Sequence, residues 1–430
     1  MDETYKIVYE KSSPFEEITD EDGDSCDDVH ALSKWVSASF KELLQMKEFH
    51  VAAVNFTSYG ASFVHIDKAG NPLTPLYNYL KKYPEALSKK FYNTYGGEIA
   101  FSMHTASPVL GSLNSGMQLY RLKHEKKAVF EEVEYSLHLP QYLGYLITGK
   151  AYSDLTSIGC HTGLWNFPQK SYHEWVFREG VIDKLAPIRS SDQADEIVVN
   201  GKKIKAGIGL HDSSAALIPY LRSFSDPFLL ISTGTWSISL NPFNSQPLNV
   251  YELQNDCLSY MTYLGNPVKA SRLFAGYEHE QQVKRLAAHF NTAENYYTTV
   301  SYNADIASGL SALPMEGTGN ITVFPTRNLG EFRDYETAYH QLISDIVDRQ
   351  VFSSQLVLKD TDVKRIFVDG GFGKNPVYMK MLAKAFPAIE VYAASVAQAT
   401  SLGAALAIHP HWNSGPIPSD IISFKLSFAD

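Results

Sequence analysis

The chain contains few cysteines, no long apolar run and no excess of positive charge. Its 430 residues include three cysteines, Cys26, Cys160 and Cys257, which lie far apart in the sequence. Neither a disulfide framework nor a zinc-binding spacing can be built from them, so we expect three free thiols. No apolar stretch approaches the ~18 residues that a membrane-spanning helix needs. We therefore expect no association with a membrane.

The charge balance also excludes some partners. The chain has 37 basic and 47 acidic side chains, a net charge of −10 and a pI of about 5.8. No basic stripe is present, so we expect no binding to nucleic acid, although a local positive pocket for a nucleotide stays compatible with these totals. Residues 1–6 form no apolar signal region, which favours a cytoplasmic protein.

Length and composition predict a globular protein of more than one domain. Hydrophobic residues make up 44% of the chain and charged residues 20%, which is ordinary for a globular protein. A chain of this length is expected to form two to three domains. A modest change in composition over residues 188–226 favours a division into residues 1–218 and 219–430.

An acidic loop over residues 16–28 precedes the first expected helix, over residues 28–46. Its Asp20, Asp22 and Asp24 suggest calcium binding, but Ser25 stands where a calcium loop requires glycine. No glutamate follows at the twelfth position either. We therefore expect a solvated loop that caps the helix.

Hydrophobic periodicity predicts alternating strands and helices along the rest of the chain. An Asn-Gly pair at residues 200–201 predicts a hairpin turn. Residues 72–185 are expected to be mostly helical. Strands are expected over residues 5–10, 51–56, 61–67, 228–231, 236–240 and 365–368, and helices over 140–149, 335–358, 375–386 and 396–408. Residues 114–119 are expected to form a turn that enters a helix.

The segment Ala206–Ala216 places one acidic side chain, Asp212, after a glycine-flanked turn and at the start of an expected helix. A carboxylate in this position can accept a proton from an attacking hydroxyl group. The alternative is that Asp212 only caps the helix, which is the most common role of such an aspartate. The neighbouring His211 is a candidate ligand contact, or simply a packed side chain.

Two further segments are suited to binding a nucleotide. Thr233, Gly234 and Thr235 form a turn between two expected strands, where backbone N–H groups and hydroxyls can receive phosphate oxygens. The segment Val368–Pro376 includes Gly370 and Gly371 and leads into a helix near Asn375. Each segment alone could be an ordinary turn. Together with Asp212 they favour phosphoryl transfer from a nucleotide to an alcohol.

These motifs resemble those of the FGGY carbohydrate kinases, over nearly the whole chain. The segment Gly209–Ala216 is similar to the one that holds the family's catalytic aspartate, and Ser232–Ser237 is similar to its second phosphate loop. The segments Asp369–Asn375 and Ala399–Ala405 resemble its adenosine-binding segment and closing helix, and Tyr59–Gly70 resembles its sugar-side hairpin.

The resemblance implies an α/β, two-domain fold of the actin-like/hexokinase/Hsp70 ATPase (ribonuclease H-like) class, with a cleft between a sugar-binding domain (1–218) and a nucleotide-binding domain (219–430). It implies ATP and Mg²⁺ as cofactors, a sugar as substrate, and compatibility with a homodimer. No protein metal ligand is assigned. It implies Asp212 as the general base; Thr233, Gly234, Thr235, Gly370, Gly371 and Asn375 at ATP; and Tyr59, Gly60, Asn114, Gln118 and His211 at the sugar.

Within the family, the His-Asp pair and the Gly-Thr-Trp-Ser loop look most like kinases of 6-deoxyketohexoses, which phosphorylate L-rhamnulose or L-fuculose on O1. Thr57 and Ser62 depart from this pattern, because rhamnulokinases tend to carry acidic side chains at these positions. Pentuloses therefore stay open as substrates. The family's first phosphate hairpin has no counterpart here, so we expect that ~15–20 residues are missing before Met1, a size judged from domain anatomy.

Two alternative functions remain at this point. The chain could be a sugar-binding or regulatory relic of a kinase, because it has no counterpart of the first phosphate hairpin. It could also be an ATPase of the same fold that acts on an acid, although the pattern of residues 207–216 argues against an acid substrate.

Overall fold

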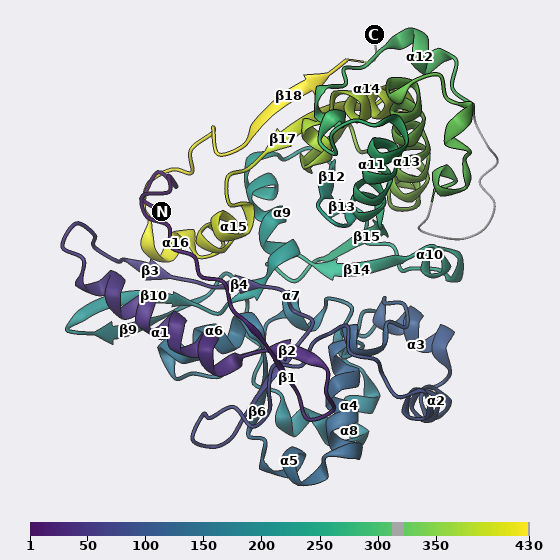
Figure 1. Cartoon of the computed structure of the whole chain (residues 1–430). Helices are drawn as coiled ribbons and strands as arrows, with labels where there is room; N and C mark the ends of the chain where they lie inside the picture. The colour runs from purple at the N-terminus through teal and green to yellow at the C-terminus, as the bar shows by residue number, and fades with distance from the viewer. Residues whose placement is uncertain (312–321, 429–430) are drawn as a thin grey trace. The chain divides into compact units, whose positions relative to one another are not determined.

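The computed structural model describes residues 1–311 and 322–428, which form two compact units (Figure 1). Unit 1 comprises Met1–Ser223, Ser259–Pro267 and Gln398–Ile421. Unit 2 comprises Phe224–Leu258, Val268–Ala397 and Ile422–Asp430. Both units thus contain segments from distant parts of the sequence. No described helix combines the length and the apolar character needed to cross a membrane.

Unit 1 is built from helices and several small sheets. Its strands pair as β1-β2, β3-β10-β9, β11-β4, β5-β6 and β7-β8. The strands are β1 (Glu17–Thr19), β2 (Ser25–Asp27), β3 (Ala53–Val54), β4 (Thr57–Ser58), β5 (Phe63–Ile66), β6 (Tyr135–His138), β7 (Trp165–Asn166), β8 (Ser171–Tyr172), β9 (Ala194–Val199), β10 (Lys202–Gly207) and β11 (Leu210–His211). The helices are α1 (Val29–Gln45), α2 (Glu85–Thr94), α3 (Glu98–Thr105), α4 (Ser115–Glu125), α5 (Lys127–Glu132), α6 (Leu139–Thr148), α7 (Leu155–Ile158), α8 (Glu174–Arg178), α9 (Asp212–Ser223), α15 (Ala399–Ala407) and α16 (His409–Trp412), with the 3-10 helices Gly111–Leu113 and Val181–Lys184.

Helix ends in unit 1 follow local sequence signals. Asp28 caps α1 by accepting from the amides of His30 and Ala31, as the acidic loop predicts. The helix α6 ends at Gly149, which adopts a left-handed conformation that glycine tolerates without strain. The β9–β10 hairpin turns at Asn200 and Gly201, which both have positive φ. These predicted elements are confirmed.

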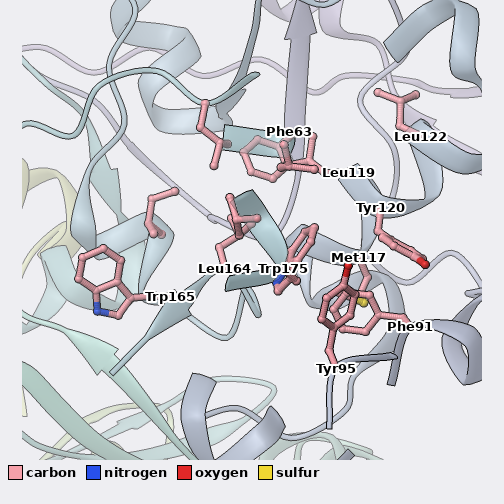
Figure 2. Packing of buried hydrophobic residues seen from close by; sticks show 14 of the residues in the cluster. Phe63, Phe91, Tyr95, Met117, Leu119, Tyr120, Leu122, Leu164, Trp165 and Trp175 are labelled. Carbon is pink, nitrogen blue, oxygen red and sulfur yellow. The ribbon is translucent and has the colours of Figure 1, made fainter. Parts of the chain in front are cut away.

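An aromatic cluster forms a core of unit 1 (Figure 2). The Phe91 ring lies edge-on to the rings of Phe101 (5.1 Å), Tyr120 (4.9 Å) and Trp175 (5.3 Å between centroids). Such T-shaped pairs place the positive edge of one ring against the negative face of another. Trp175 is fully buried, and its indole N–H donates to the carbonyl of Gly163 at 2.8 Å. The burial of its one polar group is thereby compensated.

Unit 2 is organised around a seven-stranded sheet of order β14-β15-β13-β12-β16-β17-β18, although Ser259–Met261 of the edge strand β14 and the first residue of β15 are assigned to unit 1. The strands β12, β16 and β17 are parallel, whereas β13 is antiparallel to both β12 and β15. The strands are β12 (Phe228–Thr233), β13 (Ser237–Asn241), β14 (Cys257–Met261), β15 (Pro267–Leu273), β16 (Arg365–Gly370), β17 (Glu390–Ser395) and β18 (Ser423–Ser427). The helices are α10 (Val250–Gln254), α11 (Ala275–Phe290), α12 (Ala304–Ser308), α13 (Tyr335–Leu358) and α14 (Pro376–Ala385), with 3-10 turns at Tyr296–Thr299, Phe324–Thr326, Leu329–Glu331 and Phe372–Lys374.

Two predicted strands near the N-terminus are wrong or shorter than expected. Residues 5–10 form no strand, because Tyr5 has a φ of 65° and its ring packs against His409 and Trp412 instead of continuing an extended chain. The strand expected over residues 51–56 is reduced to β3. There the Asn55 carboxamide oxygen accepts the amide of Phe56 and so interrupts the ladder.

The acidic loop also differs from its prediction. Its three aspartates, Asp20, Asp22 and Asp24, surround the ammonium of Lys81, which is buried. The Asp20 side chain is fully buried as well, so the loop is not simply solvated. The ion pairs fasten the β1–β2 hairpin to the segment that follows β5. The sequence gives no signal for this partner, which is far from the loop along the chain.

Helices α9 and α15 pack closely in unit 1, although their sequences are far apart. A Cβ atom added at Gly403 on α15 would lie 1.9 Å from the carbonyl oxygen of Ala215 on α9. The amide of Asn55 donates to the carbonyl of Ala404 at 2.8 Å, which ties the same helix to the strand region. The backbones therefore approach to a distance that only glycine permits.

This contact predicts that two glycine substitutions in unit 1 differ in their effect on stability. Gly403→Ala is expected to lower the free energy of unfolding by about 1–3 kcal/mol or more, because the new methyl group meets rigid backbone. Gly144→Ala on α6 is the matched control, since its Cβ would lie 3.6 Å from the nearest atom of another element, the carbonyl oxygen of Ile208. The control is expected to be neutral or to stabilise by up to about 1 kcal/mol.

Urea unfolding followed by tryptophan fluorescence would measure both effects. Four of the tryptophans, Trp35, Trp165, Trp175 and Trp412, belong to unit 1, so the signal reports mainly on that unit. Equal stabilities for the two variants would contradict the close packing of α9 on α15.

Candidate active site

Asp212, the predicted general base, is the first residue of α9 in unit 1. Its Oδ1 accepts the amide of Ser213 at 2.6 Å, and 40% of its side chain stays exposed. A negative side chain at a helix N-terminus interacts favourably with the helix dipole. Asp212 therefore combines a fixed position with access to solvent, which a group that accepts a proton from a ligand requires.

His211 is buried behind Asp212 and is held by a chain of hydrogen bonds. Its Nε2 lies 3.3 Å from Cys160 Sγ and 3.4 Å from Asp212 Oδ1. Its amide donates to Thr156 Oγ1 at 2.9 Å, and that hydroxyl in turn donates to the buried Asp154. The Nδ1 atom of His211 is buried without a hydrogen-bond partner in the described part of the chain. One polar atom of the ring is thus left for a ligand.

The same region contains a group that could hold a soft metal ion. One potential ligand atom each from Cys160, His161 and His211 lies within 4.8 Å of the others, and all three residues are buried. Sulfur and imidazole nitrogen suit zinc or copper, whereas magnesium prefers oxygen ligands. This group therefore does not fit the magnesium ion that accompanies ATP.

Tyr59 and Gly60, predicted at the sugar, lie next to His211. A Cβ atom at Gly60 would approach His211 Cδ2 to 2.6 Å, so a side chain here would displace the imidazole. The Tyr59 hydroxyl donates to Asp27 Oδ2 at 2.7 Å, and burial is the main reason that the pKa of this hydroxyl is raised. Gly60 and His211 are thus in close contact, and Tyr59 precedes Gly60 in the chain.

Asn114 and Gln118, also predicted at the sugar, differ in how much of their hydrogen-bonding capacity is used. The Asn114 amide donates to the carbonyl of His161 at 2.6 Å and to Ser107 Oγ at 2.9 Å, and its oxygen accepts the amide of Leu110. Gln118 donates through Nε2 to two carbonyls, but its Oε1 is buried without a partner among the described residues. Gln118 therefore keeps an acceptor for a ligand, whereas Asn114 mainly fixes the backbone.

Gln118 also lines a cavity of about 30 Å³ in unit 1. The cavity wall carries Lys81, Arg121 and Lys126, together with Asp22. Neither Asp212 nor His211 belongs to this wall. The cavity is therefore separate from the predicted general base.

In unit 2, the predicted phosphate turn joins β12 to β13. Gly234 and Thr235 are exposed, whereas Thr233 is anchored, because its hydroxyl donates to the carbonyl of Asp369 at 2.6 Å. Behind the turn, a Cβ atom at Gly276 would lie 1.8 Å from the carbonyl oxygen of Gly234. The turn is therefore supported from behind by the backbone of α11 and open to solvent at its tip.

Gly370, Gly371 and Asn375 follow the adjacent strand β16. Thr233 pairs with Gly370 in the parallel ladder, and the amide of Gly371 donates to the carbonyl of Thr233 at 3.1 Å. Apart from the two adjacent residues, no described atom lies within 4 Å of a Cβ built at Gly371, so space is open beside it. Asn375 caps α14 through Oδ1 and donates through Nδ2 to the Tyr339 hydroxyl at 2.8 Å. The two glycine-bearing segments are thus brought together within unit 2.

Two residues that support these sites were not among the predicted ones. Asp154 accepts from Thr156, Ser157 and Ser191, and it holds the hydroxyl that positions His211. Its signal in the sequence is an aspartate that precedes two hydroxyl residues, which is typical of a helix cap. Gly276 has no local signal, because its role depends on a turn about forty residues earlier in the chain.

Comparisons with known proteins identify the family. Residues 1–217 match the model described as FGGY family of carbohydrate kinases, N-terminal domain. Residues 225–415 match the model described as Carbohydrate kinase FGGY, C-terminal domain. The two models together cover most of the chain, one on each side of residues 218–224.

Individual relatives are distant in sequence. A rhamnulokinase of Bacteroides thetaiotaomicron is 22% identical over 225 residues, which cover 49% of this chain and 44% of that protein. A rhamnulokinase of Ligilactobacillus salivarius is 24% identical over 247 residues, covering 52% and 48%. The chain thus spans about half the length of the curated relatives that it matches.

Solved structures are similar in fold. A carbohydrate kinase from Novosphingobium aromaticivorans superposes with a TM-score of 0.78 at 20% identity, covering 99% of this chain and 93% of that one. A xylulose kinase from Rhodospirillum rubrum superposes with a TM-score of 0.77 at 14% identity, covering 97% and 88%. The predicted fold class, a two-domain mixed α/β sugar-kinase fold, is confirmed.

Two further histidines, His138 and His65, are buried in unit 1. His138 stacks on Phe63 and its Nε2 lies 2.9 Å from Ser115 Oγ at the start of α4. Burial lowers the pKa of His138 to about 3, with smaller contributions from His211 and His161. Burial likewise lowers the pKa of His65 to about 4. These imidazoles are therefore neutral in the folded protein at neutral pH.

This predicts a loss of stability in mild acid. Between pH 6.5 and about 4, the unfolded chain protonates these histidines and the folded chain does not, so the free energy of unfolding falls as the pH is lowered. Each group contributes up to about 1.4 kcal/mol per pH unit in this window.

His138→Gln, which keeps a partner for Ser115, is expected to reduce the slope of the unfolding free energy against pH by the equivalent of about one proton. Urea unfolding at several pH values measures this slope. His30→Gln is the exposed control, and equal slopes for the His138 variant and the wild type would contradict the assignment.

Proposed function

The chain belongs to the FGGY family of carbohydrate kinases, and on this basis we propose that it transfers the γ-phosphoryl group of ATP to a hydroxyl group of a ketose sugar. The observation that carries the proposal is the position of Asp212 at the exposed N-terminus of α9, directly beside the buried His211. A half-exposed carboxylate held in this way suits the deprotonation of a ligand hydroxyl.

In this proposal Asp212 acts as the general base. It accepts the proton of the attacking sugar hydroxyl while the oxygen forms its bond to the γ-phosphorus and the bond to the leaving ADP oxygen breaks. His211 orients the sugar through its free Nδ1 atom. Its position is maintained by Thr156 and, through that hydroxyl, by Asp154.

The nucleotide is assigned to unit 2. Gly234 and Thr235 hold the β- and γ-phosphates through the exposed tip of the turn, and Thr233 anchors that tip. Gly371 leaves space for the nucleotide, and Asn375 caps the helix that follows. Gly370 is assigned beside it, where the absence of a side chain lets the backbone approach the carbonyl of Thr233. Magnesium would be carried by the nucleotide phosphates, where it neutralises negative charge, and no described residue is assigned to it.

The sugar is assigned to unit 1, where Tyr59, Gly60, Gln118 and His211 line the binding surface and Asn114 fixes its backbone. A 6-deoxyketohexose such as L-rhamnulose or L-fuculose is our first choice, supported by the relatives that are rhamnulokinases. Ser62 is buried and donates to the carbonyl of Tyr77, and Thr57 Oγ1 is buried without a partner among the described residues. Because neither position carries an acid, pentuloses are the second choice. The cytoplasmic location and the homodimer stay predictions.

An assay of ADP release against a panel of ketoses tests the activity. Asp212→Asn is expected to lower kcat by about 10²–10⁴-fold, because an amide cannot accept the proton. The exposed Asp183→Asn in unit 1 is the matched control, since it removes one carboxylate elsewhere. Wild-type turnover by the Asp212 variant on the preferred ketose would disprove the assigned base.

The nucleotide assignment predicts a selective effect of Gly371→Val. The fold has room for this side chain and the φ of Gly371 is not positive, so stability is expected to change by less than about 1 kcal/mol. The isopropyl group occupies the space assigned to ATP, so KM for ATP is expected to rise about tenfold or more, with the sugar KM unchanged. An unchanged KM for ATP, measured at saturating sugar, would show that the nucleotide lies elsewhere.

A further inference from the structure

Arg349 is a buried arginine for which the described part of unit 2 provides no counter-ion within ion-pair distance. It lies in the second half of α13 and only 6% of it is exposed. Among the described residues, its Nε is buried with no hydrogen-bond partner, and no carboxylate lies within ion-pair distance of its guanidinium. An arginine side chain keeps its charge under all ordinary conditions. A buried charge of this kind is costly unless an anion accompanies it.

Two acidic groups near Arg349, Asp345 and Glu278, have other partners. Asp345, one helical turn earlier, is bound by Arg327 through two hydrogen bonds of 2.7 and 2.8 Å. Glu278 accepts both the amide and the hydroxyl of Thr322, and burial raises its pKa. The positive charge of Arg349 lowers the pKa of the Glu278 carboxyl group, but this effect is weaker than the effect of burial, which raises it. Neither carboxylate neutralises Arg349 directly.

A cavity of about 50 Å³ adjoins Arg349. Its wall carries Asn255, Asp256, Arg272, Phe352 and Ser353 beside Arg349. A volume of ~10–15 Å³ on this measure holds one water-sized group. The cavity therefore has room for about four such groups, which is the number of oxygens in a phosphate or sulfate ion.

The charges in the cavity wall favour an anion. Asp256 forms a two-point ion pair with Arg272, with distances of 2.7 and 3.2 Å. Two guanidinium groups and one carboxylate give a formal charge of +1 in the wall. A guanidinium group binds an oxyanion through two parallel N–H donors, a geometry that a water molecule cannot satisfy as well.

We propose that this cavity between α10, β15 and α13 is a binding site for a compact phosphate-like oxyanion, with Arg349 as its main ligand. Its size fits a single tetrahedral anion, either as the free ion or as the phosphoryl group of a small metabolite. The site is distinct from the residues assigned to ATP. Arg272 nevertheless stacks over the Trp236 ring at 5.1 Å, so the wall contacts the segment that carries Gly234 and Thr235.

Inorganic phosphate and sulfate are the probes for a test on the full chain. At constant ionic strength, the wild type is expected to show a saturable rise in Tm and a change in Trp236 fluorescence. Arg349→Met keeps the volume and removes the charge, and it is expected to weaken phosphate binding by about 10–100-fold, the range of a hydrogen bond to a charged group. Without phosphate, Arg349→Met is expected to have a Tm equal to or above that of the wild type, because an unpaired buried charge is removed.

Three matched variants separate this site from other effects. Arg178→Met removes an exposed arginine, and Thr235→Ala alters the phosphate turn; both are expected to keep the phosphate response. If Arg349→Met does not fold, Arg349→Lys keeps the charge without the planar fork and is expected to lose about tenfold in affinity.

Three outcomes overturn the proposal. The wild type shows no saturable change in Tm or fluorescence with phosphate, both Arg349 variants keep the wild-type phosphate response, or only Thr235→Ala loses it. Comparison of inorganic phosphate with a sugar phosphate then distinguishes a free ion from a phosphorylated metabolite. Because binding is measured without turnover, failure of this proposal is separate from failure of the kinase assignment.

Discussion

The close contact between α9 and α15 is the constraint on which the candidate base depends. Gly403 leaves room for the carbonyl of Ala215, and Asn55 joins the same helix to the strand region. Because α9 is held at Ala215, Asp212 at its first residue has a defined position although its side chain is exposed. The rigid part of this site is therefore backbone packing, and the reactive group is placed at its end.

The candidate sugar site in unit 1 and the candidate nucleotide site in unit 2 both depend on a glycine that permits close packing. In unit 2, Gly276 allows α11 to support the turn at Gly234, so the turn presents its tip to solvent without relying on its own side chains. In unit 1, Gly60 allows His211 to approach the backbone. In both cases a glycine without a side chain lets another part of the chain pack closely behind the functional group. This packing restricts the conformations of the group, so less conformational entropy is lost when a ligand binds.

Sequence reasoning predicted those features that local patterns determine. The bounds of α13, the cap at Asp28 and the turn at residues 200–201 agree with the structure, because each follows from neighbouring residues. Features that depend on distant partners were missed or misjudged. Lys81 gathers the acidic loop, Asn55 interrupts the strand expected at residues 51–56, and Asp154 supports His211 through Thr156. For the candidate site, the residue types could be predicted, but not which polar atoms are already used: Asn114 is fully engaged and Gln118 is not.

The order of segments along the chain has a consequence for synthesis on the ribosome. The polypeptide passes between the two units at five places, after residues 223, 258, 267, 397 and 421. The partner of α9 is therefore translated only after most of unit 2. At about 5–20 residues per second, roughly 10–40 s separate the emergence of α9 from that of α15. During this time the first unit lacks the helix that completes it, so the nascent chain has an unpaired helix face for chaperones to cover.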